Sequence, residues 1–221
     1  SGLANNIPLI EEIASLKKPT IISTGMLYEH EIKEIIKIFK RKKNNNICLL
    51  KCTSLYPSPD KTINLNSIAT LKKKFPYPIG YSDHTLDDFA ILSAVSLGAN
   101  IIEKHITLDK KAPNADHFLS IEPPELKIMV QKIRRIENIM GNAAIIPVKQ
   151  EIILRKERHR CIVASKLILK NDKINYNNIG LKRPLKNKIG LETKYYNKII
   201  GLKVKKNILK DEPITMKKLN I

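Results

Sequence analysis

The segment Pro78-Ile79-Gly80-Tyr81-Ser82-Asp83-His84 is typical of a short apolar strand that ends in polar residues. A helix is expected directly after it, with Thr85 as its N-cap, Asp88 three residues on and Gly98 at its end. The same order recurs, with strands expected at 18–25, 46–52 and 100–105 and helices at 29–40, 63–74 and 124–140. Four successive strand-then-helix units predict an α/β fold with a parallel sheet.

Polar residues stand at the carboxyl end of each predicted strand. In parallel α/β folds these ends meet at one mouth, where ligands bind. A single Ser or Thr at such a place is a helix cap or a hydrogen-bonded core group about as often as it is a ligand-binding residue. A shared location on four strands favours a ligand site over that alternative. The residues concerned are Ser23-Thr24-Gly25, Thr53-Ser54, Ser82-Asp83-His84 and Glu103-Lys104-His105.

His84 and His105 are separated by 21 residues, which is enough for one helix between neighbouring strands. Their imidazoles are therefore expected at the same height of the sheet, within metal-ligand distance of each other. The alternative is that each histidine is only hydrogen-bonded at its strand end. Two imidazole ligands beside Asp83 and Glu103 would leave most octahedral positions to water and substrate oxygens. That arrangement suits an exchangeable, carbonyl-polarising ion such as Mn²⁺.

The composition of the 221-residue chain, 43% hydrophobic and 28% charged, is that of a globular protein. No apolar run approaches the ~18 residues of a membrane span, and the first residues lack the features of a signal peptide. We therefore expect a cytoplasmic protein without a membrane partner. Cys48, Cys52 and Cys161 are expected as buried free thiols, because the first two lie in one extended strand and no second pair completes a zinc site.

The net charge of +19 would suit a protein that binds nucleic acid. Residues 151–221 hold 19 Lys and Arg against 6 Asp and Glu, so most of the excess lies in the last third of the chain. Lys, Ile and Asn are frequent throughout the chain, which a general bias in the composition of the source would produce without selection for binding a polyanion. We therefore interpret the charge as a solvated basic surface and predict no nucleic-acid partner.

Five motifs follow one another along the chain. They are Ser23-Thr24-Gly25-Met26, Cys52-Thr53-Ser54-Leu55-Tyr56-Pro57, Gly80-Tyr81-Ser82-Asp83-His84-Thr85, Ile102-Glu103-Lys104-His105 and Pro113-Asn114-Ala115-Asp116-His117. In order and spacing they resemble the sialic acid synthase (N-acetylneuraminate synthase) family. From about residue 160 onward the chain is similar to the small antifreeze-like domain that follows the barrel in this family.

The resemblance implies a fold and a domain order. Residues 1–145 would form the C-terminal half of a (β/α)8 TIM barrel, residues 146–159 a linker, and residues 160–221 an antifreeze-like (SAF, β-clip) domain. A domain-swapped homodimer is also implied, because Arg183 matches an arginine that reaches the partner's barrel mouth and binds the acetamido group of the sugar. On composition alone, Arg183 would be one more member of a basic surface.

The resemblance also implies an activity. Phosphoenolpyruvate would condense with N-acetylmannosamine or a related 2-acetamido hexose to a nonulosonic (sialic-type) acid, with release of phosphate. His84 and His105 are implied as ligands of a divalent metal, with Mn²⁺ expected first and Mg²⁺ or Co²⁺ as alternatives. Glu103 and Asp83 are the candidate catalytic carboxylates, although a carboxylate beside a metal ligand is often only its support. The implied substrate-binding residues are Ser1, Ser23, Ser54 and Ser82 for phosphoenolpyruvate, and Tyr56, Asp116 and Arg183 for the sugar.

Two departures from the family bear on this interpretation. Leu3 stands where an acidic residue is common, so a catalytic or orienting carboxylate is expected to be missing. The chain also opens at what resembles a mid-barrel strand, so we expect it to be inactive alone and to act as part of a longer or split enzyme. A non-catalytic remnant and a basic polyanion-binding protein are the alternatives. The sialic, legionaminic and pseudaminic pathways all remain open as the source of the sugar.

Overall fold

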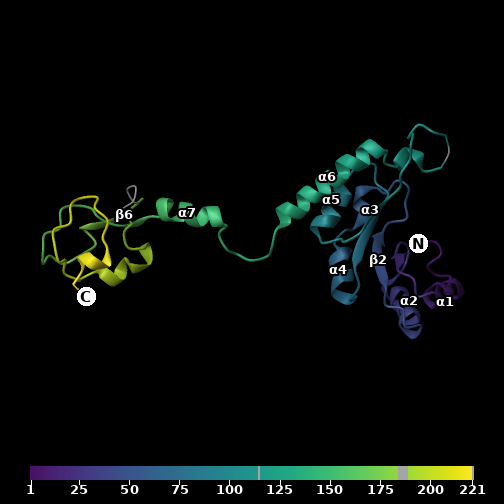
Figure 1. The fold of residues 1–221 in the computed structure, drawn as a ribbon, viewed down its shortest axis with the longest axis horizontal. Coiled ribbons are helices and arrows are strands. Elements are labelled where there is room, and N and C mark those ends of the chain that lie inside the picture. Colours follow the sequence, from purple (N-terminus) through teal and green to yellow (C-terminus); the bar gives the residue numbers. More distant parts are fainter. Residues whose placement is uncertain (114, 184–188, 221) are drawn as a thin grey trace. The chain divides into compact units, whose positions relative to one another are not determined.

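The computed structural model describes residues 1–113, 115–183 and 189–220 of the chain (Figure 1). The chain divides into two compact units, Ser1–Asn142 (unit 1) and Ala143–Ile221 (unit 2). The motif residues Asn114 and Pro184 lie outside the described residues. Within the described ranges, no helix has the length and apolar character needed to span a membrane.

The centre of unit 1 is a parallel sheet with the strand order β1-β2-β3-β4. Its strands are β1 (Thr20–Ser23), β2 (Ile47–Cys52), β3 (Ile79–Asp83) and β4 (Ile102–Lys104). In the register of the sheet, Ser82 pairs with Cys52 on one side and with Glu103 on the other. Parallel strands in sequence order, with helices between them, form half of a (β/α)8 barrel, which confirms the predicted fold class.

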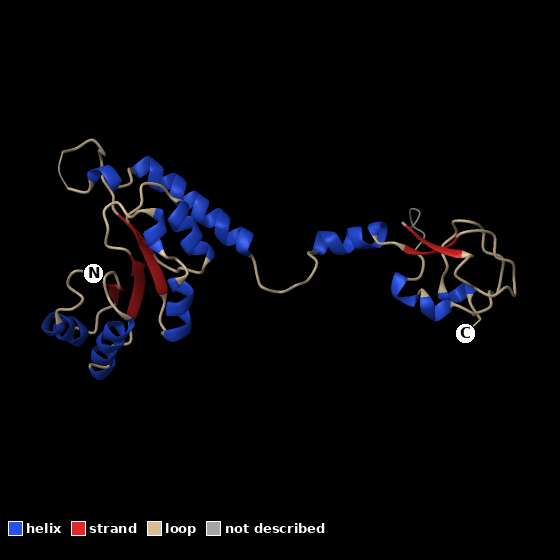
Figure 2. Cartoon of the chain, turned by 180° about the vertical axis from the view of Figure 1, so that it is seen from behind, coloured by secondary structure: helices blue, strands red, loops and turns tan. Residues whose placement is uncertain are grey.

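The helices of unit 1 alternate with the strands and lie around the sheet (Figure 2). They are α1 (Ile7–Ser15), α2 (Glu29–Arg41), α3 (Asp60–Ile63), α4 (Ser67–Lys74), α5 (Phe89–Ser96) and α6 (Pro123–Met140), with the 3₁₀ turn η1 (His117–Leu119). The single helix predicted over 63–74 is wrong, because Asn64 has a left-handed backbone (φ 51°) that ends α3. The predicted N-cap is also wrong: α5 begins at Phe89, and the Thr85 hydroxyl donates to the Asp83 carboxylate instead.

The sheet of unit 1 has two faces of different character. Apolar strand residues such as Ile22, Leu49 and Ile79 are buried in the core that the sheet forms with the helices. We call this side the helix face. Successive strand residues point to opposite sides, so the residues between them form a second face, which we call the mouth face. At the strand ends the mouth face carries Ser23, Cys52, Ser82 and Glu103, whereas Tyr81, Asp83 and Lys104 lie on the helix face.

Unit 2 is a small β-rich body that follows a helix. The helix α7 (Lys149–Arg158) occupies most of the segment expected as a linker. Beyond it, β5 (Cys161–Ala164) pairs antiparallel with β6 (Ile179–Lys182). The 3₁₀ turns are η2 (Thr193–Tyr195), η3 (Asn197–Ile199) and η4 (Met216–Lys218). Buried aliphatic residues from many short segments form a core of its own, which includes Ile162, Ile168, Ile174, Val204 and Leu219.

Candidate functional site

Three serine hydroxyls meet on the mouth face of unit 1. Ser1 Oγ lies 3.0 Å from Ser23 Oγ and 3.0 Å from Ser54 Oγ. Gly25 makes room for them, because a Cβ at this position would lie 2.4 Å from Ser54 Oγ and 2.6 Å from Ser1 Oγ. Such hydroxyls can donate to the oxygens of a phosphate or a carboxylate. The structure thus places three of the four serines predicted to bind phosphoenolpyruvate side by side.

Ser82, the fourth serine, holds Glu103 on the neighbouring strand. Ser82 Oγ donates to Glu103 Oε1 over 2.6 Å. The serine is buried, whereas the carboxylate is exposed at the mouth. The bond therefore fixes one oxygen of Glu103 and leaves the other accessible to a substrate.

The rings of His84, His105 and Tyr56 form a cluster at the same mouth. The centroids of the two imidazoles are 5.2 Å apart, with an interplanar angle of 71°. The centroid of the Tyr56 ring lies 4.2 Å from that of His84 and 5.7 Å from that of His105. The predicted proximity of the two histidines is confirmed, and their role as metal ligands stays a prediction.

The two imidazoles differ in what lies at Nδ1. His84 Nδ1 lies 2.9 Å from the carbonyl oxygen of Thr53, and because a carbonyl only accepts, the proton of this bond is on Nδ1. His105 Nδ1 lies 3.7 Å from Asp116 Oδ2. Burial alone would lower the pKa of His84, but the contacts with the Cys52 thiol and the Thr53 carbonyl outweigh it and raise this pKa. Because Nδ1 of His84 is bonded to the Thr53 carbonyl, Nε2 is the nitrogen of this ring that can bind a ligand.

This donor pair fits a divalent ion. Metal-bound histidines usually have the other ring nitrogen hydrogen-bonded to a carbonyl or carboxylate, as His84 does here. For His105 the neighbouring carboxylate oxygen of Asp116 is 3.7 Å away, which is longer than a hydrogen bond. Among the residues that the structure describes, no group of three or more His, Cys, Asp or Glu side chains could hold a metal. An ion held by the two imidazoles alone would take its other ligands from water or substrate, and whether a metal binds here stays a prediction.

Asp83, the second predicted catalytic carboxylate, does not belong to this group. It is fully buried on the helix face, where Oδ2 accepts from Lys104 Nζ over 2.7 Å. Tyr81 Oη and Thr85 Oγ1 donate to the same carboxylate over 2.9 Å each. The alternation of side chains along β3 turns Asp83 away from the face that carries Ser82. The expectation that Asp83 faces the mouth is therefore wrong, and its catalytic role stays a prediction.

Cys52 joins the site as more than the buried free thiol that was predicted. It is free and buried, and its Sγ lies 3.7 Å from Ser1 Oγ, 3.9 Å from Ser54 Oγ and 4.0 Å from His84 Nδ1. Burial raises the pKa of the thiol, but hydrogen bonds, with that of His84 the strongest, lower it to about 6. The sequence could have indicated this position, because Cys52 is the last residue of β2 and therefore lies at the strand ends where the site forms.

The remaining predicted residues lie at the edge of the site or outside it. Asp116 is partly exposed and faces His105 at the mouth. Leu3 is exposed in the turn after Ser1, so it presents an apolar side chain where the resemblance expects a carboxylate. Arg183 is exposed directly after β6 in unit 2, and its role at a partner's mouth stays a prediction.

Comparison with known proteins places these motifs in a family. Residues 1–144 match the model of the NeuB family, and residues 159–220 match that of the SAF domain. An uncharacterised protein of Methanocaldococcus jannaschii is 43% identical over 97% of this chain and 63% of its own length. A pseudaminic acid synthase of Campylobacter jejuni is 38% identical over 93% of this chain and 59% of its own.

A solved structure supports the same relationship. The N-acetylneuraminic acid (sialic acid) synthetase of Leptospira borgpetersenii, in complex with citrate, is 40% identical, with a TM-score of 0.65 over 69% of this chain and 54% of that chain. The chain spans only 59% to 64% of the length of the first curated relatives that it matches. Because the family model covers all four strands of unit 1 and the strand ends that build the site, the chain belongs to the NeuB family and carries a SAF domain after the barrel strands.

Proposed function

We propose that this chain is part of a synthase that condenses phosphoenolpyruvate with a 2-acetamido hexose to give a nonulosonic acid and phosphate. The observation that carries the proposal is the adjacency of His84 and His105 beside the serine hydroxyls at one mouth. The relatives named as pseudaminic acid and N-acetylneuraminic acid synthases support it. The proposal concerns the activity of the whole protein, and the inactivity of this chain alone stays a prediction.

The serine cluster is proposed as the site of phosphoenolpyruvate. The Ser1 hydroxyl lies 3.0 Å from those of Ser23 and Ser54, so three neutral donors are close together. The Cys52 thiol lies beside them. Such donors can bind phosphate and carboxylate oxygens. The net charge of +19 adds a positive potential that would raise the local concentration of this trianionic substrate.

The histidine cluster is proposed as the site of the sugar aldehyde. A divalent ion bound there, Mn²⁺ by preference, would polarise the aldehyde. The Thr53 carbonyl keeps the His84 imidazole oriented, and Tyr56 and Asp116 would contact the sugar. C3 of phosphoenolpyruvate would form the bond to the aldehyde carbon, water would add at C2, and phosphate would leave. Glu103, held by Ser82, would act as an acid, a base or an orienting group.

The proposed assembly is a homodimer with an exchanged SAF domain. Arg183 lies in unit 2 and is exposed, so its guanidinium is accessible to an acetamido group of a substrate bound at the mouth of a partner subunit. The domain that would be exchanged is the one that matches the SAF model over residues 159–220.

A chimera tests the proposed reaction. This chain would replace the matched segment of the N,N′-diacetyllegionaminic acid synthase of Campylobacter jejuni, of which it covers 64%. The chimera would be given phosphoenolpyruvate, Mn²⁺ and, in turn, the hexoses that lead to sialic, legionaminic and pseudaminic acids. We expect phosphate release that depends on one of the hexoses, with the matching nonulosonic acid detected by mass spectrometry.

Matched variants connect that outcome to the site. His84→Asn keeps a donor for the Thr53 carbonyl but removes Nε2, so turnover should be lost. His30→Asn changes an exposed histidine of α2 and should leave turnover intact. A folded chimera that releases no phosphate with any hexose would contradict the proposal and favour the non-catalytic remnant.

A further inference from the structure

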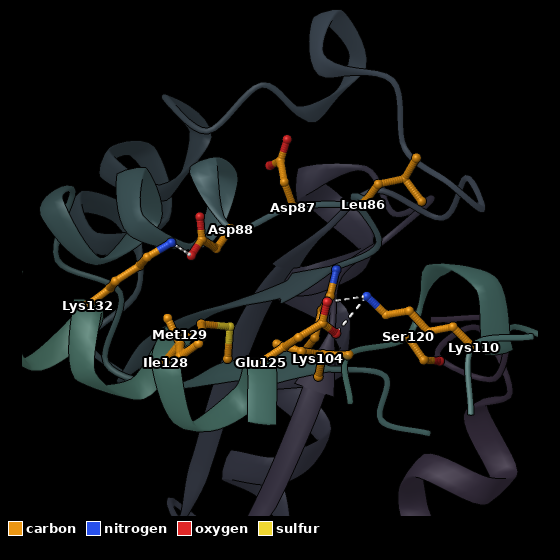
Figure 3. A pocket seen from close by; sticks show the side chains of 11 residues that line it. Leu86, Asp87, Asp88, Lys104, Lys110, Ser120, Glu125, Ile128, Met129 and Lys132 are labelled. Carbon is orange, nitrogen blue, oxygen red and sulfur yellow. Dashed lines mark hydrogen bonds and ion pairs between the residues drawn. The ribbon is translucent and has the colours of Figure 1, made fainter. Parts of the chain in front are cut away.

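Three lysines line a cavity between β4 and α6, and each of them has a carboxylate partner (Figure 3). The N–O distances are 2.6–2.7 Å, and the pairs are Lys104 with Asp83, Lys110 with Glu125 and Lys132 with Asp88. A neighbouring negative charge favours the protonated form of an amine. A protonated amine has no lone pair, so these three side chains are poor nucleophiles.

Lys51 is a lysine of another kind, on the helix face near the end of β2. It pairs in register with Tyr81 of β3, so its side chain leaves the sheet on the side away from the mouth. The residue is only partly exposed. Within the part of the chain that the structure describes, no Asp or Glu oxygen lies within ion-pair distance of Nζ, and both of its polar contacts are neutral groups. The amine is therefore held without an opposite charge.

The two polar contacts of Lys51 suit a neutral amine. Nζ donates to the carbonyl oxygen of Cys52 over 3.0 Å and to Thr53 Oγ1 over 3.2 Å. The Thr53 hydroxyl donates its own proton to the carbonyl of Thr62 over 3.3 Å, so toward Lys51 it can only accept. A neutral amine has two N–H protons, which these two acceptors use, and its lone pair stays free. An ammonium group would have a third proton without an acceptor in the described chain.

Burial acts in the same direction as these contacts. Desolvation of the side chain lowers the pKa of Lys51, because it disfavours the charged form. The neighbouring Cys52 thiol raises this pKa, but burial outweighs it. Tyr81, opposite on β3, has its hydroxyl on the Asp83 carboxylate, whose charge Lys104 balances. Lys51 therefore has more free amine near neutral pH than an ordinary lysine, and desolvated lysines of this kind are nucleophiles.

We propose that Lys51 is a modification site that takes an acyl group from a small acyl phosphate. The lone pair of Nζ forms a bond to the acyl carbon, the bond from this carbon to the phosphate oxygen breaks, and phosphate leaves with the electron pair. The nitrogen then releases one proton to water. The product is a neutral amide, so no cation has to be held at this half-buried place.

The choice of an acyl phosphate follows from access and charge. Because Lys51 is only partly exposed, a donor with a small acyl group reaches Nζ more easily than a bulky one. The net charge of +19 raises the local concentration of an anionic donor. The amide that forms keeps one N–H for the Cys52 carbonyl or for Thr53 Oγ1, so the end of β2 retains one of its two bonds to this side chain.

Acetylation of the folded, full chain with acetyl phosphate tests the proposal. Mass spectrometry of proteolytic peptides gives the initial rate at each lysine, and two other lysines are internal controls. Lys37 is exposed and paired with Glu34, and Lys104 is buried on the same face as Lys51 and paired with Asp83. Near neutral pH we expect Lys51 to react at least about threefold faster than Lys37 and at least about tenfold faster than Lys104, because only Lys51 lacks a carboxylate.

The pH dependence distinguishes a free amine from mere accessibility. The advantage of Lys51 over Lys37 should be largest near neutral pH and shrink toward about pH 10, where much of any ordinary lysine is neutral. In urea, where burial is lost, the two lysines should react at equal rates. Equal rates in the folded chain would overturn the proposal, as would an advantage that does not change with pH. The experiment needs no turnover, so its outcome is independent of the proposed synthase activity.

Discussion

The two faces of β3 and β4 carry polar groups of opposite character at the same height of the sheet. On the mouth face, Glu103 is exposed and only one of its oxygens is held by Ser82. On the helix face, the Asp83 and Lys104 side chains are 0% and 6% exposed and bonded to each other. One face thus keeps atoms free for substrates, and the other uses its charges to hold the strands together. Adjacent residues in the sequence can therefore have unrelated tasks.

The largest effect is expected on the helix face, from Lys104→Met. The variant leaves the Asp83 carboxylate buried without its cation, so the free energy of unfolding should fall by about 3–5 kcal/mol. Urea denaturation followed by circular dichroism measures it. The double variant Asp83→Leu with Lys104→Met removes both charges and should recover part of the loss, because the buried Tyr81 hydroxyl still loses its acceptor. A loss below about 1 kcal/mol for the single variant would mean that the pair is not what holds this face.

A smaller loss is expected from Thr85→Val on the same face. Thr85 Oγ1 donates to Asp83 Oδ2 over 2.9 Å, and losing a hydrogen bond to a charged group costs about 1.5–3 kcal/mol. The same denaturation experiment measures it. Thr62→Val is the matched control, because the Thr62 hydroxyl donates to the carbonyl of Pro59 at the surface. Equal losses in the two variants would show that the hydrogen bond to Asp83 contributes no more to stability than a hydrogen bond at the surface.

Much of unit 1 could be predicted from the sequence for physical reasons. Apolar runs followed by helical spacing correctly predict parallel strands in sequence order, because each crossover needs one helix. The spacing of 21 residues correctly predicts that His84 and His105 are neighbours, since it is the length of chain that leads from the end of one strand through a helix to the end of the next strand. These features depend on periodicity and length, which a sequence displays directly.

The errors arose where one local backbone choice decides the outcome. The left-handed backbone of Asn64 ends α3 inside the range predicted as one helix, and the spacing of apolar residues does not indicate that conformation. Asp83 was grouped with the mouth because the end of β3 could not be located, yet a strand that continues through Asp83 turns it to the other face. Thr85 was taken as a helix cap, because its competing partner, Asp83, becomes visible only in the fold.

On the mouth face, Ser82→Ala is expected to have a modest effect on stability. It removes one bond to the partly solvated Glu103, so the loss should be about 0.5–1.5 kcal/mol. In the chimera the same variant should lower kcat more than it raises KM for the sugar, because Glu103 loses its orientation. Ser96→Ala, whose hydroxyl donates to the Leu92 carbonyl at the surface of α5, is the control and should leave kcat unchanged. A loss as large as that of Lys104→Met would erase the distinction between the two faces.

His105→Phe should have the smallest effect on stability and the largest on metal binding. The phenyl ring can keep the contacts with Tyr56 and His84, and the His105 side chain is 34% exposed, so unfolding should change by less than about 0.5 kcal/mol. The variant lacks both ring nitrogens, so Mn²⁺ affinity, measured by electron paramagnetic resonance of the full chain, should fall at least about tenfold. His30→Phe, on the exposed side of α2, should change neither quantity. Unchanged Mn²⁺ affinity would contradict a metal site at these two histidines. A large loss of stability would mean that the His105 imidazole, like Lys104, is part of the core.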